Sequence, residues 1–322
     1  MRNLINATVT QVHHWNDTLF SFKTTRESSF RFESGQFVMI GLEVDGRPLM
    51  RAYSIASPNY DEELEFFSIK VPDGALTSRL QNIEPGDQVM INVRPTGTLV
   101  PGFLLPGKHL YLLSTGTGLA PFMSIIRDPF IYESFEKIIL VHGTRWRSEL
   151  AYQNEIEHQL PNNPYFGDEV REKLIYYPTV TRESYEKNGI AHEGRITKLI
   201  ESGKLLDDIG MPELDTENDR FMLCGNDNML QDLMSMLDDK GFSKANSRRQ
   251  GHYVIEQAFI ESELEKINDC VLFPYGVNWF KNTNSINDFL STYPKYLRHM
   301  NPRLPWYNNL KNPFYLTGKI DK

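Results

Sequence analysis

The chain has 322 residues and a formal net charge of −8, with 40% apolar and 24% charged residues. This composition is typical of a folded protein of about two domains, and it argues against disorder and against nucleic-acid binding. Its 2 cysteines, Cys224 and Cys270, are too few for a disulfide framework, a zinc site or an iron–sulfur cluster, so no metal is expected. We find no signal peptide and no membrane-spanning segment, and therefore expect a cytoplasmic protein without membrane contacts.

The first hundred residues predict a domain of short strands. Turn signals rich in Gly, Pro and Asn separate strand-like runs at 7–15, 19–25, 30–44, 49–57, 64–71 and 88–100. One segment, 76–83, has helical spacing, with Thr77 or Ser78 as the expected N-cap. Many short strands with one small helix predict an antiparallel β-barrel.

After an expected linker at 104–108, apolar strands alternate with amphipathic helices. Strands are expected at 109–114, 137–143, 173–181, 219–225 and 251–259, and helices at 115–128, 148–160, 194–205 and 226–241. This alternation predicts an α/β domain with a parallel sheet between helices. The last residues are rich in Pro, Asn and aromatic side chains without periodicity. We therefore expect three parts: 1–103, 104–261 and a C-terminal extension, 262–322.

Two glycine turns of the expected α/β domain follow strands. In the first, Gly116 and Gly118 would let the backbone approach a ligand, and the helix behind them offers free N–H groups to a pyrophosphate. A tight turn without a ligand is the alternative. In the second, "MLCGND", Cys224 would either face a nicotinamide ring or be a small core residue.

Three arginines lie between these two glycine turns along the chain. Arg145 and Arg182 come just after expected strands, at the edge where parallel sheets bind ligands, and Arg195 begins a helix. Guanidinium groups there would suit the extra phosphate of NADP. No acidic residue follows the first glycine turn to hold a ribose hydroxyl, which favours NADP over NAD. Alternatively, these are solvated surface arginines.

The segment "RPLMRAYSIASP" combines three functional groups on one expected strand. Arg51 would pair with a pyrophosphate, Tyr53 would lie against a flat heterocycle, and Ser54 would bond a ring nitrogen. These are requirements of a flavin dinucleotide. Downstream, 68–71 would offer strand-edge backbone and 74–78 another helix start. The alternative is an amphipathic barrel strand with an isolated arginine.

Taken together, these motifs resemble the bacterial ferredoxin (flavodoxin)–NADP reductases. The matching segments occur in the family's order up to about Glu261, and they include "RAYSIASP", "LLPGKHLYLLSTGTGLAPF", "LVHGTRWRSELAY", "KLIYYPTVTRE" and "GHYVIEQAF". The resemblance implies an FAD-binding antiparallel barrel followed by an NADP-binding α/β domain. It also implies reversible electron transfer between NADPH and a transiently bound ferredoxin or flavodoxin, by a monomer.

The resemblance assigns roles to individual residues. Tyr53, Ser54, Cys224 and Phe259 are expected at the reaction centre, with Ser54 at the flavin N5 and Phe259 covering one flavin face. The remaining expected cofactor contacts are Arg51, Ala52, Ser68, Ile69, Lys70, Val71, Leu76 and Thr77 for FAD; Gly116, Thr117 and Gly118 between flavin and nicotinamide; and Arg145, Arg182, Arg195, Gly225, Asn226 and Asp227 for NADP(H).

The chain departs from this family at its C-terminal end. Relatives stop just after a segment like "AFVEK", whereas here Ser262 replaces the lysine and the chain continues. The extension is either functional or merely decorative. Two other functions stay open: an NAD(P)H-dependent reductase component of an oxygenase system, and a non-catalytic flavin-binding interaction module.

Overall fold

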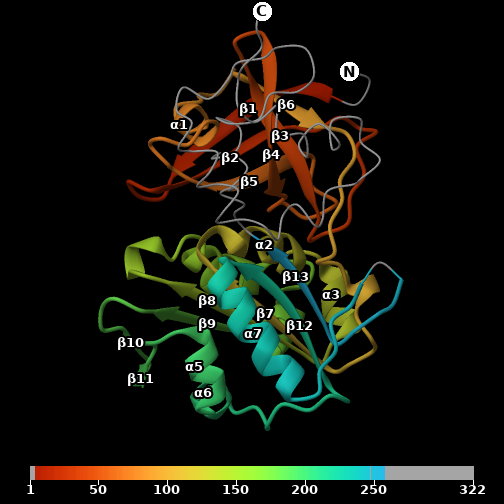
Figure 1. The fold of residues 1–322 in the computed structure, drawn as a ribbon, viewed down its shortest axis with the longest axis vertical. Helices are drawn as coiled ribbons and strands as arrows, with labels where there is room; N and C mark the ends of the chain where they lie inside the picture. Colours follow the sequence, from red (N-terminus) through yellow and green to blue (C-terminus); the bar gives the residue numbers. More distant parts are fainter. Residues whose placement is uncertain (1–3, 247, 258–322) are drawn as a thin grey trace, which may run out of the picture. The chain divides into compact units, whose positions relative to one another are not determined.

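The computed structural model describes residues 4–246 and 248–257 (Figure 1). A curled antiparallel sheet is followed along the chain by a parallel sheet with helices on both faces, which confirms the predicted fold class. No helix in this described part is long and apolar enough to cross a membrane.

The antiparallel sheet has six strands in the order β4-β3-β6-β1-β2-β5. Their bounds are β1 Leu4–His14, β2 Leu19–Thr25, β3 Phe37–Val44, β4 Arg47–Ser54, β5 Glu63–Ile69 and β6 Gln88–Asn92. The two edge strands approach each other where Ile55 bridges to Phe66, so the sheet curls into a barrel. Alternating apolar residues fill its interior, among them Phe20, Phe22, Val38, Ile40, Phe66 and Ile91.

The one helix predicted in this region is shorter than expected. Helix α1 spans Thr77–Leu80, and its N-cap is Leu76, without any side-chain cap. The expected cap, Thr77, instead donates its hydroxyl to the carbonyl of Val71, at 3.3 Å. The cap prediction was therefore wrong, because the hydroxyl binds the preceding loop rather than the helix.

The parallel sheet has the strand order β13-β12-β7-β8-β9. Its strands are β7 His109–Thr115, β8 Lys137–Thr144, β9 Leu174–Val180, β12 Asp219–Gly225 and β13 Tyr253–Gln257. One face packs on α2 (Ala120–Ile126), α3 (Pro129–Ser134) and α4 (Gly167–Lys173). The other packs on α5 (Ile196–Glu201), α6 (Lys204–Ile209) and α7 (Asp227–Asp239), the last of which crosses the front of the sheet in Figure 1. Burial on both faces explains why these strands are almost wholly apolar.

The helix expected at 148–160 is broken into short pieces. They are the 3₁₀ turn η3 (Arg147–Glu149), the π-helix η4 (Glu155–Gln159) and the 3₁₀ turn η5 (Leu160–Asn162). Tyr152 has φ 63°, which no α-helix accommodates. Its buried ring packs 4.5 Å from that of Trp15 and 5.2 Å from that of Phe67, so packing against the barrel overrides the helical pattern.

Three further elements complete the described chain. The hairpin β10 (Glu186–Lys187) and β11 (Ile190–Ala191) forms where only a loop was expected. Asn188 and Gly189 at its tip both have positive φ, as a two-residue hairpin turn requires. The 3₁₀ turns η1 (Pro101–Phe103) and η2 (Gly116–Leu119) precede the linker and helix α2. The predicted boundary at 103/104 stays a prediction, and the part assigned to 262–322 lies outside the described residues.

Candidate functional site

The seam of the barrel gathers the residues of the "RAYS" motif. Strand β4 ends at Ser54, immediately before the Ile55–Phe66 bridge to β5. Across this seam the hydroxyl of Tyr53 lies 3.1 Å from that of Ser68. The end of β4 and the end of β5, which were singled out separately in the sequence, are therefore brought together.

Within this seam, burial raises the pKa of the Tyr53 hydroxyl, so the phenol stays neutral and its ring is held by the barrel core. Arg51 is half-buried, and its guanidinium donates a 3.0 Å hydrogen bond to the Met50 carbonyl. Ala52, between Arg51 and Tyr53, is exposed, while Ser54 is half-buried. A cation, a fixed aromatic ring and a hydroxyl thus follow one another along an edge strand of the sheet.

The loop after β5 folds back onto the strand end. The Gly74 N–H donates a 3.0 Å hydrogen bond to the Val71 carbonyl, which also accepts the Thr77 hydroxyl. A Cβ atom at Gly74 would lie under 3.0 Å from the Thr77 hydroxyl, so this tight turn requires glycine. The Lys70 ammonium is engaged by the Asn16 carbonyl at 3.1 Å. The expected contacts 68–71, Leu76 and Thr77 therefore form one compact strip beside the seam.

The two glycine turns of the parallel sheet pack backbone against backbone. A Cβ atom at Gly118 would lie under 3.0 Å from the Cys224 carbonyl oxygen, and one at Gly225 under 3.0 Å from the Thr115 hydroxyl. That hydroxyl accepts hydrogen bonds of 3.2 Å from both the backbone N–H and the side-chain amide of Asn226. The turns can lie this close only because both glycines lack side chains.

Gly116 is constrained in a different way. Its φ is +54°, in the left-handed region that favours glycine, and nothing in the described protein lies within 4 Å of the position of its missing Cβ. Thr117 beside it is buried. The backbone here is open to a ligand at the carboxyl end of β7, so the residues present fit a dinucleotide at this turn.

The second glycine turn leads into α7, the longest helix among the described residues. The Asn226 side chain accepts a 3.0 Å hydrogen bond from the Met229 N–H and so caps α7, while Asp227 is exposed in its first turn. Cys224 is only 1% exposed, and burial, aided by Glu256, raises the pKa of its thiol well above the usual value. A neutral thiol offers no thiolate nucleophile, so any role of Cys224 is one of packing or contact.

Glu256 is a candidate site residue that the sequence reasoning missed. It lies beside Cys224 in the register of β12 and β13, and its Oε1 accepts a 2.6 Å hydrogen bond from the Thr98 N–H. Burial raises its pKa to about 7, against the lowering effect of the N–H groups of Thr98 and Leu99. The lone acid in the apolar run "YVIEQ" was the available signal.

Arg145, Arg182 and Arg195 all reach the same edge of the parallel sheet. The Arg182 N–H donates a 3.0 Å hydrogen bond to the Arg145 carbonyl, and Gly194, next to Arg195, donates one of 2.9 Å to Val180. All three arginines are exposed, and none of the ion pairs in the described part of the chain includes them. The structure therefore places three exposed arginines on backbone segments that meet at one edge of the sheet.

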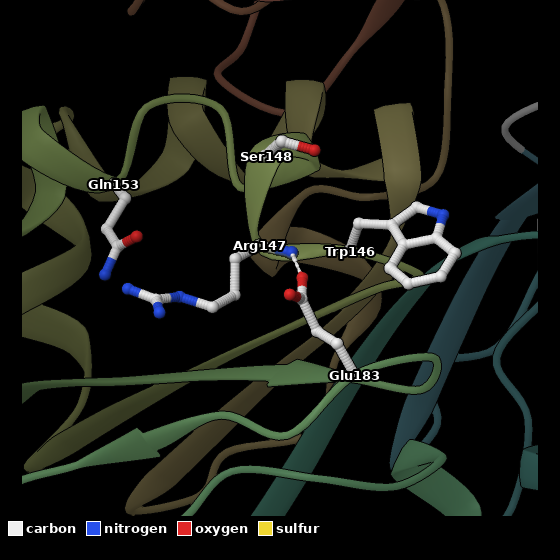
Figure 2. A pocket seen from close by; sticks show the side chains of 5 residues that line it. All are labelled: Trp146, Arg147, Ser148, Gln153 and Glu183. Carbon is white, nitrogen blue, oxygen red and sulfur yellow. Dashed lines mark hydrogen bonds between the residues drawn. The ribbon is translucent and has the colours of Figure 1, made fainter.

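A hollow of about 440 Å³ adjoins this arginine cluster (Figure 2). It is lined by Trp146, Arg147, Ser148, Gln153 and Glu183. Figure 2 shows the Glu183 carboxylate between Arg147 and Trp146, accepting the Arg147 backbone N–H. The Arg147 guanidinium lies 4.8 Å from the Tyr185 ring centroid. Sequence reasoning missed Trp146 and Arg147, although both belong to a quoted motif.

Phe259 lies outside the described residues, so its place over a flavin stays a prediction. No group of three or more His, Cys, Asp and Glu side chains within residues 4–246 and 248–257 could hold a metal ion.

Comparisons with known proteins agree along most of the chain. Residues 6–100 match the family described as Oxidoreductase FAD-binding domain, and residues 112–234 match Oxidoreductase NAD-binding domain. The chain is 62% identical over 263 residues to a ferredoxin–NADP reductase of Pseudomonas aeruginosa, which covers 81% of this chain and 100% of the relative. It is 35% identical over 232 residues to a flavodoxin/ferredoxin–NADP reductase of Escherichia coli, covering 72% and 89% respectively.

A solved structure shows the same architecture. The crystal structure of a ferredoxin NADP⁺ reductase from Neisseria gonorrhoeae, with bound FAD and NADP, aligns with a TM-score of 0.72 at 28% identity. The alignment covers 80% of this chain and 99% of that protein. The similarity therefore includes both sheets.

Proposed function

The chain belongs to the ferredoxin–NADP reductase family, and on this premise we propose how its residues perform electron transfer between NADPH and a ferredoxin or flavodoxin. It is an oxidoreductase that uses FAD and NADP(H). The observation that best supports the placement of the nucleotide is the open backbone of Gly116, beside the buried contact of Gly118 with Cys224. When bound, the flavin would supply both chemistries, accepting a hydride from nicotinamide and releasing single electrons to the protein partner.

The barrel seam provides the flavin contacts in this proposal. Arg51 would neutralise the pyrophosphate of FAD, the ring of Tyr53 would lie against the flavin, and Ser54 would form a hydrogen bond with the flavin N5. Tyr53 can act as a rigid wall because its hydroxyl is fixed by Ser68 and its ring by the barrel core. The further flavin contacts that we propose are Ala52, Ser68, Ile69, Lys70, Val71, Leu76 and Thr77.

The parallel sheet provides the NADP(H) contacts. Gly116, Thr117 and Gly118 would receive the nicotinamide end of the dinucleotide. The Cys224–Asp227 turn, which packs against Gly118, would lie beneath it. Arg145, Arg182 and Arg195 bind the phosphate on the adenosine ribose, for which the fork of a guanidinium is well suited. Because the reaction needs two rings held in contact, positioning is the main task of these residues, and no general base is required.

We further propose a monomer in the cytoplasm, with FAD bound by residues 1–103 and NADP(H) by residues 104–261. Neither nucleic acid nor membrane is a partner. Both alternatives from the sequence are less well supported. A reductase component of an oxygenase would share the fold. However, the alignment with the Pseudomonas aeruginosa ferredoxin–NADP reductase covers 100% of that relative at 62% identity. A non-catalytic module would not need the exposed arginines that suit NADPH.

The proposal is tested by assaying the purified full-length chain, loaded with FAD, for reduction of a ferredoxin and a flavodoxin. NADPH should support reduction of at least one partner at a rate well above that with NADH. A flavin-loaded protein that oxidises NADPH with a small-molecule acceptor but reduces neither protein would refute the proposed partners. One that oxidises no NADPH would refute the enzyme itself.

A further inference from the structure

Helix α2 and the residue after it bind the segment that follows β4 of the barrel. The helix begins immediately after the Gly116–Leu119 turn, and its seven residues span about 10 Å. From its second half, the buried hydroxyl of Ser124 donates a 2.7 Å hydrogen bond to the Ser57 carbonyl. Arg127, directly after the helix, donates one of 3.0 Å to the carbonyl of Ala56. Two consecutive carbonyls of the barrel are therefore held by one helix.

Arg127 is also the centre of a buried ionic network. Its side chain is 11% exposed, and its guanidinium lies 2.8 Å from Oε2 of Glu65, on β5, and 2.5 Å from Oε1 of Glu155. The remaining oxygen of Glu65 accepts the Tyr152 hydroxyl at 2.8 Å. Burial by itself would lower the pKa of Arg127, but the two carboxylates raise it above its ordinary value, so the cation is permanent.

The network holds a short segment, Ala56 and Ser57, which is also hydrogen-bonded to β5. The Ala56 N–H donates a 2.8 Å hydrogen bond to the Glu65 carbonyl, and the Glu65 N–H donates one of 3.0 Å to the Ser57 hydroxyl. Ala56 is two residues from Ser54, while Glu65 lies on the same strand as Ser68. Any shift of α2 relative to Ala56 and Ser57 therefore moves the glycine turn relative to Ser54.

We propose that Arg127, with Ser124, is a positioning device that sets the separation between the flavin and the nicotinamide. This inference rests on the proposed function, since it concerns the hydride step of that reaction. Arg127 touches neither ring. It acts through α2 on the Gly116–Gly118 turn, and through Ala56 and Glu65 on the barrel seam. A displacement of about 1 Å between reacting groups costs about 10²-fold in rate.

The variants are chosen to keep the chain folded. Arg127→Lys retains the buried charge, but an ammonium cannot reproduce the fork that binds Ala56, Glu65 and Glu155 together. Ser124→Ala removes only one hydroxyl. The matched control is Arg220→Lys. Arg220 is likewise largely buried, at 4% exposure, and its guanidinium donates to backbone carbonyls outside the barrel strands, those of Leu105, Pro106, Thr216, Glu217 and Asp219.

Hydrogen exchange of the full-length protein provides a readout that does not depend on turnover. The amides of residues 55–57 should exchange faster in Ser124→Ala by about two- to tenfold, the effect of one lost hydrogen bond, and faster still in Arg127→Lys. Arg220→Lys should leave these amides as they are in the wild type. Unchanged exchange in both test variants would overturn the claim that Ser124 and Arg127 hold this segment.

Anaerobic reduction of the bound flavin by NADPH provides the kinetic readout. Arg127→Lys should slow reduction by about 10²-fold. NADPH affinity should stay that of the wild type, and the isotope effect with NADPH deuterated at the transferred position should change. Ser124→Ala should show the same pattern to a smaller degree, and it carries the test alone if Arg127→Lys does not fold. Wild-type rates and isotope effects in the test variants would overturn this inference and leave the proposed function standing. A wild-type flavin that NADPH leaves oxidised would overturn the proposed function, and this inference with it.

Discussion

The backbone N–H of Thr98 donates a 2.6 Å hydrogen bond to Oε1 of Glu256, which connects the segment after the last barrel strand to the edge strand of the parallel sheet. The carboxyl group is largely buried, and burial raises its pKa to about 7 from the usual 4.5. It therefore keeps its proton in the folded chain at pH values where the unfolded chain has lost it.

This shift makes stability depend on pH. Because the folded pKa of Glu256 is the higher one, its contribution to the free energy of unfolding is present below pH 4.5 and is lost as the pH rises through about 7. The loss should approach about 3 kcal/mol. Glu256→Gln keeps an acceptor for Thr98 without the charge, so denaturant unfolding between pH 5 and 8 should show a flatter dependence. Glu186→Gln on the exposed hairpin is the control, and an unchanged slope in Glu256→Gln would contradict the prediction.

Arg51, Tyr53 and the three arginines could be chosen as candidate site residues from the sequence, because their positions relative to neighbouring strands and helices suffice to place them. Strand β4 carries the first group in succession, and each arginine follows a strand or begins a helix. Parallel strands end at one edge of a sheet. The alternation of strands and helices along the chain is therefore enough to predict that the three arginines lie at that edge. The same local patterns predicted the barrel and the parallel sheet.

The partners of Glu256 and Arg127, and the break in the helix at Tyr152, could not be predicted in this way. Glu256 depends on Thr98, far away in the chain, and Arg127 depends on Ala56 and Glu65. The 148–160 pattern is helical by itself, yet Tyr152 leaves the helical region to pack on the barrel. In each case the deciding contact joins residues far apart in the chain, one from the barrel region and one from the α/β region, and the local periodicity of neither region contains it.

Replacing Arg182 should separate NADPH from NADH. In the proposed site, Arg182→Ala would remove a charge-assisted hydrogen bond to the extra phosphate of NADPH, worth about 1.5–3 kcal/mol or about 10- to 100-fold in affinity. NADH lacks that phosphate and should bind almost as before. Titration of both nucleotides checks this. Arg171→Ala, an exposed arginine of α4 paired with Asp168, is the control and should change neither affinity. Equal losses for NADPH and NADH in Arg182→Ala would refute the phosphate role.

The two glycines of the first turn should respond differently to alanine. Gly118→Ala places a methyl group against the Cys224 carbonyl, so the two turns must separate, and stability should fall by about 1–3 kcal/mol. The added methyl of Gly116→Ala has no atom of residues 4–246 or 248–257 within 4 Å, so the substitution costs only its left-handed backbone, about 1 kcal/mol.

NADPH affinity separates the two substitutions further. In Gly116→Ala the loss of NADPH binding free energy should exceed the loss of stability, because the methyl group points into the space assigned to the dinucleotide. Thermal unfolding and nucleotide titration of both variants check these expectations. A Gly116→Ala protein that binds NADPH as tightly as the wild type would show that the nucleotide lies elsewhere.

The central claim is that NADPH and a flavin meet between the barrel seam and the first glycine turn. The most direct test is the visible absorbance spectrum of the purified full-length protein, recorded before and after anaerobic addition of NADPH. We expect the spectrum of a bound flavin, which bleaches with NADPH and more slowly with NADH. A protein that neither carries nor takes up FAD, or whose bound flavin NADPH leaves oxidised, would contradict it.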